Sequence, residues 1–493
     1  MSAAAEPRID VGDLVTDLSV VRAADARAWL ATAAMAIVTD LAIRRDPGLA
    51  TAVFVVVVAA GLVGSGRLTN PASRRLALVT PVFGASLYLY VSPLMVGLNA
   101  MAAAGLLALA ASLAREGDPF DVTLPDLVRR SLVAVAHGVA APAFLLGGGG
   151  ARSRRRRRMA AGGGGPAVAR GLLLAAPVVV VLGVLLGTAD PVFASWFQIG
   201  DVGDLVVHVI VLGIGAWAGG GLIRMASSVA PGPLPVTDRR LGFVESVTVL
   251  GSLVALYAVF AVAQLVAVAG GAGKVLDTSG LTYAEYARSG FFQLLAVATL
   301  TLGVLLAIRA AADLSTPMRH QTFLVLGEAA IVLTLAIVVV AVRRLHLYEQ
   351  AYGLTLLRLF ACVFALWVGG VFVLLAASLA GVHPRRRWLV PAAISLGLVC
   401  VVALDVVNPD RLVVARNIDR YEHTGRLDVD HLAGMSDDAV PGLASTLARL
   451  DAVTRQAVVA RLCRTERAGG HDWLSHSRSA DLAERARNKV CSS

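Results

Sequence analysis

Long apolar stretches, separated by short polar loops, follow one another along most of this chain. Each contains roughly 16–25 mostly apolar residues, close to the ~20 that a helix needs to cross ~30 Å of hydrocarbon. A bilayer offers no hydrogen-bond partner to exposed backbone groups, so we expect helices rather than strands. The eleven stretches lie at residues 29–43, 48–65, 76–91, 93–113, 169–187, 205–223, 242–269, 291–308, 322–342, 357–380 and 388–406.

The stretch at 127–146 differs from the others. Its uncharged part has only 16 residues and includes His137 and Pro142, and Arg129 and Arg130 stand near its start. It is therefore either a twelfth span or a helix lying in the membrane interface.

Composition supports the same class of protein. Of the 493 residues, 57% are hydrophobic and only 16% are charged, and the mean hydropathy is +0.73. A soluble domain is about 25% charged, so a single soluble domain is excluded, and four cysteines are too few for a disulfide-rich scaffold. We predict an all-α, polytopic helical membrane bundle of about eleven spans, or twelve if 127–146 crosses, with a small helical C-terminal tail.

The basic residues predict an orientation. The formal net charge is +10, and Lys and Arg concentrate in short cytoplasmic loops. With eleven spans and the N-terminus inside, 24 of the 31 basic residues outside the tail fall on the inner face. With twelve spans the split becomes 17 against 14. We therefore predict a cytoplasmic N-terminus and an extracytoplasmic C-terminal tail.

The chain divides into five predicted parts. A polar N-terminal segment (1–28) precedes an N-terminal membrane bundle (29–146), and a Gly/Arg-rich cytoplasmic linker (147–168) leads to a C-terminal membrane bundle (169–406). The run Arg152–Arg158 in the linker is interpreted as an anchor for anionic lipid headgroups. No nucleic-acid partner is expected.

A helical extramembrane tail forms the fifth part, residues 407–493. Asn408 and Pro409 predict a helix start, and Gly425 predicts its end. Further helices are expected after Ser436, over Val453–Leu462 and over Asp472–Lys489. Cys463 and Cys491 also lie in the tail, and the sequence leaves open whether they pair.

Motifs of soluble enzymes, such as a phosphate-binding glycine loop or HExxH, are absent from the sequence. We therefore expect neither catalytic residues nor a cofactor. Two segments gather polar and aromatic side chains beside spans. The first contains Tyr283, Glu285, Tyr286 and Arg288, which indicate an interfacial helix with an aromatic anchor or a binding lip at the outer mouth of the bundle.

The second segment contains His346, Tyr348, Glu349 and Tyr352 and is expected to connect two spans. His346 and Glu349 could offer two metal ligands, which are too few for a site. We hypothesise that both segments, together with Asp190, form one polar surface facing the tail.

Polar residues inside spans are candidates for an ion or proton path, because each is costly in lipid. Three such residues are Asp40, Glu245 and Glu328. For Asp40 and Glu245, which lie near span ends, contact with headgroups or loops is the favoured interpretation. His208 is expected to be a hydrogen-bonded core histidine.

Several of these segments resemble a known family. The stretch from Gly280 to Leu306, the ADPVF motif at 189–193, the run from Arg344 to Leu354 and the tail motifs around Asn408–Tyr421 and 436–441 resemble the bacterial polytopic membrane family catalogued as domain of unknown function 4153, overlapping 4173. Gln293 stands where the resemblance implies an acidic residue. The resemblance implies a multi-pass protein of the bacterial cytoplasmic membrane and assigns no activity.

Two functions remain open at this level. The span number favours a transporter-like bundle, although no convincing inverted repeat is visible. The clustering of motifs at interfaces and in the tail favours an envelope scaffold or sensor that binds a protein partner. A lipid-linked transferase ranks behind both, because no paired carboxylates with suitable spacing are found.

Overall fold

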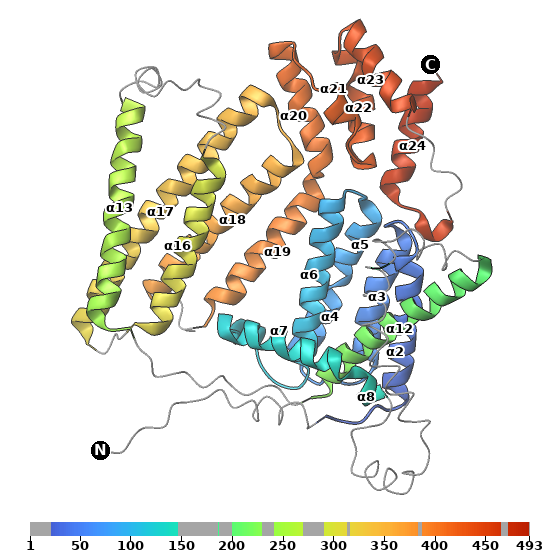
Figure 1. The fold of residues 1–493 in the computed structure, drawn as a ribbon, viewed down its shortest axis with the longest axis horizontal. Coiled ribbons are helices and arrows are strands. Elements are labelled where there is room, and N and C mark those ends of the chain that lie inside the picture. Colours follow the sequence, from blue (N-terminus) through green and yellow to red (C-terminus); the bar gives the residue numbers. More distant parts are fainter. Residues whose placement is uncertain are drawn as a thin grey trace, which may run out of the picture. The chain divides into compact units, whose positions relative to one another are not determined.

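Helices account for the regular secondary structure in a computed structural model of the chain (Figure 1). The structure describes residues 21–145, 186, 200–228, 241–269, 290–312, 316–382, 387–464 and 472–492. Within these ranges the only β-type pairings are two isolated bridges. The chain forms two units, Met1–Pro235 with Glu466–Arg485, and Val236–Thr465 with Ala486–Ser493. The predicted all-α class is confirmed.

The first unit is a bundle of helices that share one apolar core. Met35, Leu62 and Ile223 are almost fully buried in its core. Where such helices lie in lipid, close van der Waals packing of these side chains, rather than their removal from water, stabilises the unit. Its helices are α2 (Ala26–Ile43), α3 (Leu49–Gly64), α4 (Pro71–Val79), α5 (Pro81–Leu89), α6 (Pro93–Ser112), α7 (Leu124–Val139), α8 (Ala141–Leu145) and α12 (Gly200–Ala226).

The stretch predicted as one span at 76–91 is divided in the structure. Pro81 separates α4 from α5, because proline lacks the N–H that would continue the helical ladder. The backbone of Thr80 between them remains helical, so the two helices form an interrupted rod.

The ambiguous stretch at 127–146 forms the amphipathic helix α7 and the short helix α8. Thr123 and Asp126 cap the start of α7 reciprocally, and only Val133 and His137 of this helix are buried. Figure 1 shows α7 lying crosswise to α4, α5 and α6. It is not among the helices long and apolar enough to cross a membrane, which agrees with an interfacial helix.

Glycines on α12 allow this helix to approach its neighbours closely. A Cβ added at Gly215 would lie 2.7 Å from the Thr39 side chain of α2, and one at Gly221 would lie 2.9 Å from the Cα of Gly138 in α7. Gly215 and Gly219 have the small-xxx-small spacing that brings membrane helices together. The α2–α12 contact therefore depends on the absence of side chains.

The described part of the second unit contains five long apolar helices. Leu250, Ile331 and Phe372 are fully buried in its core, and the hydroxyls of Tyr257 and Thr301 join two of the helices at 2.5 Å. The five helices are α13 (Phe243–Ala269), α16 (Phe291–Ala311), α17 (Pro317–Tyr352), α18 (Leu356–Leu379) and α19 (Leu389–Val407).

Eight helices in the described ranges are long and apolar enough to span a membrane. They correspond to eight of the eleven predicted spans. The stretch at 48–65 forms the shorter apolar helix α3, and the one at 76–91 is divided as described above. The stretch at 169–187 lies outside the described residues except for Leu186.

The tail begins at the predicted place. The Asn408 side chain accepts the N–H of Arg411 at the start of α20, Pro409 is its first residue, and Gly425 ends it at a φ of 62°. Val413 and Ile418 of α20 are fully buried in the second unit. The remaining tail elements are α21 (Val429–Ala433), η2 (Asp437–Ala439), α22 (Val440–Thr446), η3 (Leu447–Arg449), α23 (Ala452–Arg464), η4 (Trp473–Ser475) and α24 (Arg478–Cys491).

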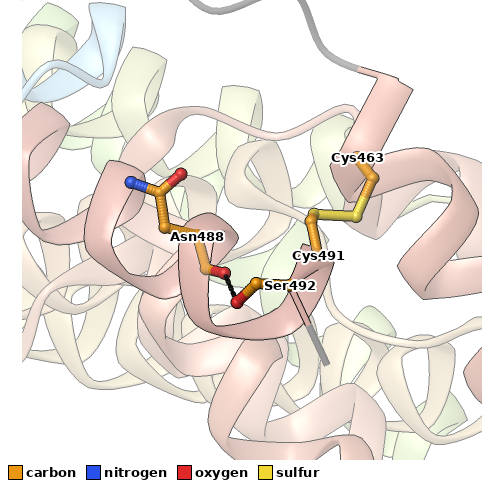
Figure 2. The surroundings of a disulfide bond; sticks show 4 residues. All are labelled: Cys463, Asn488, Cys491 and Ser492. Carbon is orange, nitrogen blue, oxygen red and sulfur yellow. Dashed lines mark hydrogen bonds between the residues drawn. A yellow bond between two sulfur atoms is a disulfide. The ribbon is translucent and has the colours of Figure 1, made fainter.

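A disulfide joins Cys463 at the end of α23 to Cys491 at the end of α24 (Figure 2). The two Cα atoms are 5.8 Å apart, within the range that disulfides require. The structure thus answers the pairing question that the sequence left open. Cys362 and Cys400, which lie in α18 and α19, are free.

Candidate functional site

The two predicted polar segments differ in how far the structure describes them. Asp190 and the cluster Tyr283, Glu285, Tyr286 and Arg288 lie outside the described residues. The second segment is described and lies in the second unit.

The sequence suggested that the second segment is a connection between spans. In the structure it is instead part of a helix. His346, Tyr348, Glu349 and Tyr352 occupy the last two turns of α17, which continues ten residues beyond the apolar stretch. A helix can continue past the hydrocarbon, because its backbone hydrogen bonds are internal. The polar side chains therefore extend one rigid helix.

The end of α17 is held by a sharp turn into α18. Gly353 adopts a φ of 84°, a conformation that side chains disfavour. The Arg358 guanidinium donates to the Gly353 carbonyl and lies 4.0 Å from the ring centroid of Tyr348, a cation–π contact. Tyr348 also packs edge-on against Tyr352. Two of the predicted tyrosines therefore stabilise this turn.

The tail helix α20 is fastened to the same turn. Arg420 donates from Nε to the Gln350 carbonyl at 2.9 Å and from Nη2 to the Ala351 carbonyl at 2.6 Å. Asn417 Nδ2 donates to the Leu354 carbonyl at 2.8 Å. The last carbonyls of a helix lack partners within the helix, and a cation there is favoured by the helix dipole. The tail therefore caps α17.

A cavity of about 770 Å³ lies between the end of α17 and the tail. Tyr352 contributes an aromatic edge that is 51% exposed, and Asp430 pairs with Arg461 at 2.5 Å. Both signs of charge and an aromatic ring therefore face one space. Its charged lining consists of Arg420, Arg426, Asp428, Asp430 and Arg461.

Tail helices are linked to each other by ion pairs. Arg449 donates to Asp419 at 2.8 Å and to Glu422 at 2.6 Å, and its bond to Glu422 lowers the pKa of that carboxyl. The hydrogen bond from Tyr421, followed by those from Thr454, holds the pKa of Asp451 well below its usual range. Asp451 also accepts the first free N–H groups of α23. These contacts fix the wall of the cavity that the tail supplies.

The spacing of His346 and Glu349 brings their side chains into contact at the surface. Their side chains lie 3.6 Å apart, and that of His346 is 63% exposed. No group of three or more potential metal ligands occurs in the described ranges.

The intramembrane candidates have distinct environments. Asp40 on α2 is buried and lies 2.8 Å from Nδ1 of His208 on α12. Glu245 accepts the Gly242 N–H at 2.9 Å, which fits its favoured interpretation as a residue at a span end. Glu328 lies in α17 with one buried carboxyl oxygen that has no hydrogen-bond partner among the described residues.

Sequence reasoning missed several polar contacts within the first unit. The guanidinium of Arg224 lies against Nδ1 of buried His137. Burial, followed by the charge of Arg224, lowers the pKa of His137 to about 4, so this imidazole is neutral at physiological pH. Arg67 is buried as well. The carbonyls to which it donates, those of Arg22 and Ala23, are 45 and 44 positions away in the sequence. Only its position between two spans could have drawn attention to Arg67.

The eight long apolar helices of the described ranges define a helical membrane protein with several candidate spans. The model of the family "Domain of unknown function (DUF4153)" matches residues 77–446, and the chain belongs to this family. The match reaches further toward the N-terminus than the resemblance noted above, and it ends before η4. Searches of curated proteins and of solved structures found no significant match.

Proposed function

We propose that this protein is an envelope scaffold or sensor, in which the membrane bundle holds the helical tail outside the cytoplasm for a protein partner. The observation that carries the proposal is the cavity between α17 and the tail, because its walls are fixed by bonds from Arg420 to the last turn of α17 and from Asn417 to the turn that follows. A preorganised surface loses less conformational entropy on binding.

The proposed orientation has a cytoplasmic N-terminus and an extracytoplasmic tail in a bacterial cytoplasmic membrane. Its first support is geometric and lies within the first unit. The Leu49 N–H donates to the His476 carbonyl at 2.9 Å, and Arg45 pairs with Asp472 at 2.8 Å. Arg22, by contrast, donates its N–H to the Ser227 carbonyl at the opposite helix ends. The residues before α2 and the tail segment 472–476 therefore lie at opposite ends of one bundle. A chain that connects opposite ends crosses the membrane an odd number of times, which supports eleven spans over twelve.

The second support is chemical. Disulfides persist in oxidising compartments and are rare in the cytoplasm, so the Cys463–Cys491 bond favours an extracytoplasmic tail. The excess of arginine on the face opposite the tail supports the same orientation, because such residues concentrate in cytoplasmic loops. The linker Arg152–Arg158, which lies outside the described residues, remains a proposed anchor for anionic headgroups, and the five-part division of the chain remains a proposal.

The partner we propose is a protein segment that carries charged and aromatic side chains. Arg426 and Asp428 offer opposite charges in the cavity, and the Tyr352 ring offers an apolar edge. Aromatic and arginine side chains frequently dominate binding energy at protein interfaces.

Site-specific photo-crosslinking in living cells tests this proposal. The crosslinking residue replaces Tyr352 in the cavity or, as a control, Val453, which is 79% exposed on α23 and outside the cavity. We expect one adduct at Tyr352, its loss on Arg426→Glu, and binding of the purified partner to the protein in nanodiscs. Equal adducts at both positions, or none at Tyr352, would contradict the proposal.

A second candidate function is proton-coupled transport. Its support is the Asp40–His208 pair, a carboxyl and an imidazole at 2.8 Å on apolar helices, with one Asp40 oxygen lacking a hydrogen-bond partner among the described residues. Such pairs occur in proton relays. Proteoliposomes with a pH-sensitive dye should then show proton flux that Asp40→Asn abolishes and that Glu245→Gln preserves. Equal flux in Asp40→Asn and in the wild type would exclude this role for the pair.

A further inference from the structure

The helix α7 lies at the end of the first unit that contains Arg22, Arg67 and Arg115, called here the arginine-rich end. It indicates the level of the membrane interface. Its residues Leu124, Val128, Leu132, Val135 and Val139 are between 48% and 67% exposed. Their spacing of three and four positions places them on one helix face. An amphipathic helix with an exposed apolar face lies in the headgroup region of a bilayer.

The end of α6 lies at the same level. Arg130 of α7 donates from Nη1 to the carbonyl and the hydroxyl of Ser112 at 3.0 and 3.1 Å. Arg115 follows three residues later and donates to the Ser227 carbonyl beyond α12. The groups around Arg115 are therefore close to the level at which α7 meets the lipid headgroups.

A cavity of about 370 Å³ opens at this place. Segments far apart in the sequence supply its walls: the residues before α2, the α3–α4 loop and the residues after α6. Its polar lining is Arg22, Arg67, Thr69, Arg115 and Glu116. Among the described residues, three arginines therefore line one space together with one acidic residue, Glu116.

Arg67 is built into the wall of this cavity. Its side chain is only 1% exposed, and it donates to the carbonyls of Arg22 and Ala23 at 3.2 and 2.8 Å. Its Nη2 also lies 3.1 Å from Asp25. Its Nε is buried and has no hydrogen-bond partner among the described residues. A buried charged group normally has all its donors paired, so Arg67, which lines the cavity, keeps one unsatisfied donor.

The remaining charges leave the cavity positive. The Ala28 N–H, followed by Arg67, lowers the pKa of Asp25, which therefore stays ionised. Asp25 also pairs with Arg22 at 3.4 Å. Counting only the residues that the structure describes, Asp25 and Glu116 balance two of the three arginines, and Arg27 lies beside Gly66 at the rim. An acceptor with negative charge is favoured here over water.

We propose that the Arg22–Arg67–Arg115 cavity binds a phosphate group. The planar guanidinium matches phosphate oxygens in bidentate geometry, and basic pockets between membrane helices on the cytoplasmic side bind phospholipid headgroups. The phosphate belongs either to an anionic phospholipid or to a soluble phosphate compound. The inference does not depend on the proposed function of the tail.

The test measures phosphatidylglycerol bound to the full-length protein by native mass spectrometry after purification from nanodiscs. The variants are Arg22→Gln and Arg115→Gln, both with exposed side chains, so Arg67, which ties loop carbonyls together, stays intact. Arg75→Gln serves as the matched control, because Arg75 is exposed at the same end but outside the cavity.

We expect about tenfold less bound lipid for each cavity variant, as for the loss of a charged hydrogen bond, and no change for the control. Inorganic phosphate that displaces the lipid and stabilises the wild type alone would identify a soluble ligand. If the wild type keeps its bound lipid when inorganic phosphate is added, the ligand is a lipid headgroup. Unchanged lipid binding in both cavity variants, or an equal loss in Arg75→Gln, would overturn the proposal.

Discussion

The disulfide in the tail offers a prediction whose magnitude follows from the chain. Cys463 and Cys491 are separated by 28 positions. In the chain-entropy model, opening a loop of this length costs about 3.5 kcal/mol of stability, because the unfolded tail regains conformational freedom. The double variant Cys463→Ser/Cys491→Ser should lose this amount from the free energy of opening α23 and α24.

Hydrogen exchange of the protein in nanodiscs measures this loss locally. Amide protection in α23 should fall by a few hundredfold, since each 1.4 kcal/mol corresponds to a factor of ten, while protection in α17 and α18 should remain. The double variant Cys362→Ser/Cys400→Ser, which removes the free cysteines, is the control. Protection in α23 that changes less than about threefold would refute the reasoning, as would alkylation of Cys463 in the unreduced wild type.

Three further predictions concern packing, pH and backbone geometry. Gly215→Ala should destabilise the first unit by about 1–3 kcal/mol in thermal unfolding, since its Cβ would lie 2.7 Å from Thr39; Gly213→Ala, with open space around it, should not, and equal effects would contradict the α2–α12 contact. Asp451 has a lowered pKa in the folded tail, so its contribution to stability is present above the unfolded pKa of about 4 and is lost as pH falls below it. Asp451→Asn should therefore reduce the acid sensitivity of α23 exchange, and an unchanged pH profile would show that other groups cause it. Gly353→Ala should loosen α20 by about 1 kcal/mol or more, because φ is 84° and the new Cβ meets Asn417; wild-type exchange in α20 would count against this.

Local signals predicted the tail well. Asn408, Pro409 and Gly425 act within a few residues of themselves, so the bounds of α20 followed directly from the sequence. The polar character of the second segment was equally visible. Its structure was misjudged, because the predicted span ended with the apolar stretch at residue 342, whereas α17 continues to Tyr352.

Contacts between distant residues could not be read in this way. Asp40 and His208 are 168 positions apart, and a single sequence carries no pairing signal between them. The acceptors of Arg420 are backbone carbonyls of α17. Every residue has such a carbonyl, so the sequence does not mark which ones accept. The division of the stretch at 76–91 was more accessible, since Pro81 was present as a signal against a continuous helix.

The central claim is that the C-terminal tail and the arginine-rich end of the first unit lie on opposite sides of the membrane. Its most direct test is cysteine labelling with a membrane-impermeant maleimide in intact cells, in a Cys362→Ser/Cys400→Ser background. Cys491→Ser frees exposed Cys463 in the tail, and Glu116→Cys, combined with Cys463→Ser and Cys491→Ser, probes the arginine-rich end. We predict that Cys463 is labelled in intact cells and that position 116 is labelled only after permeabilisation. The reverse pattern, or labelling of both positions in intact cells, would contradict the proposed topology.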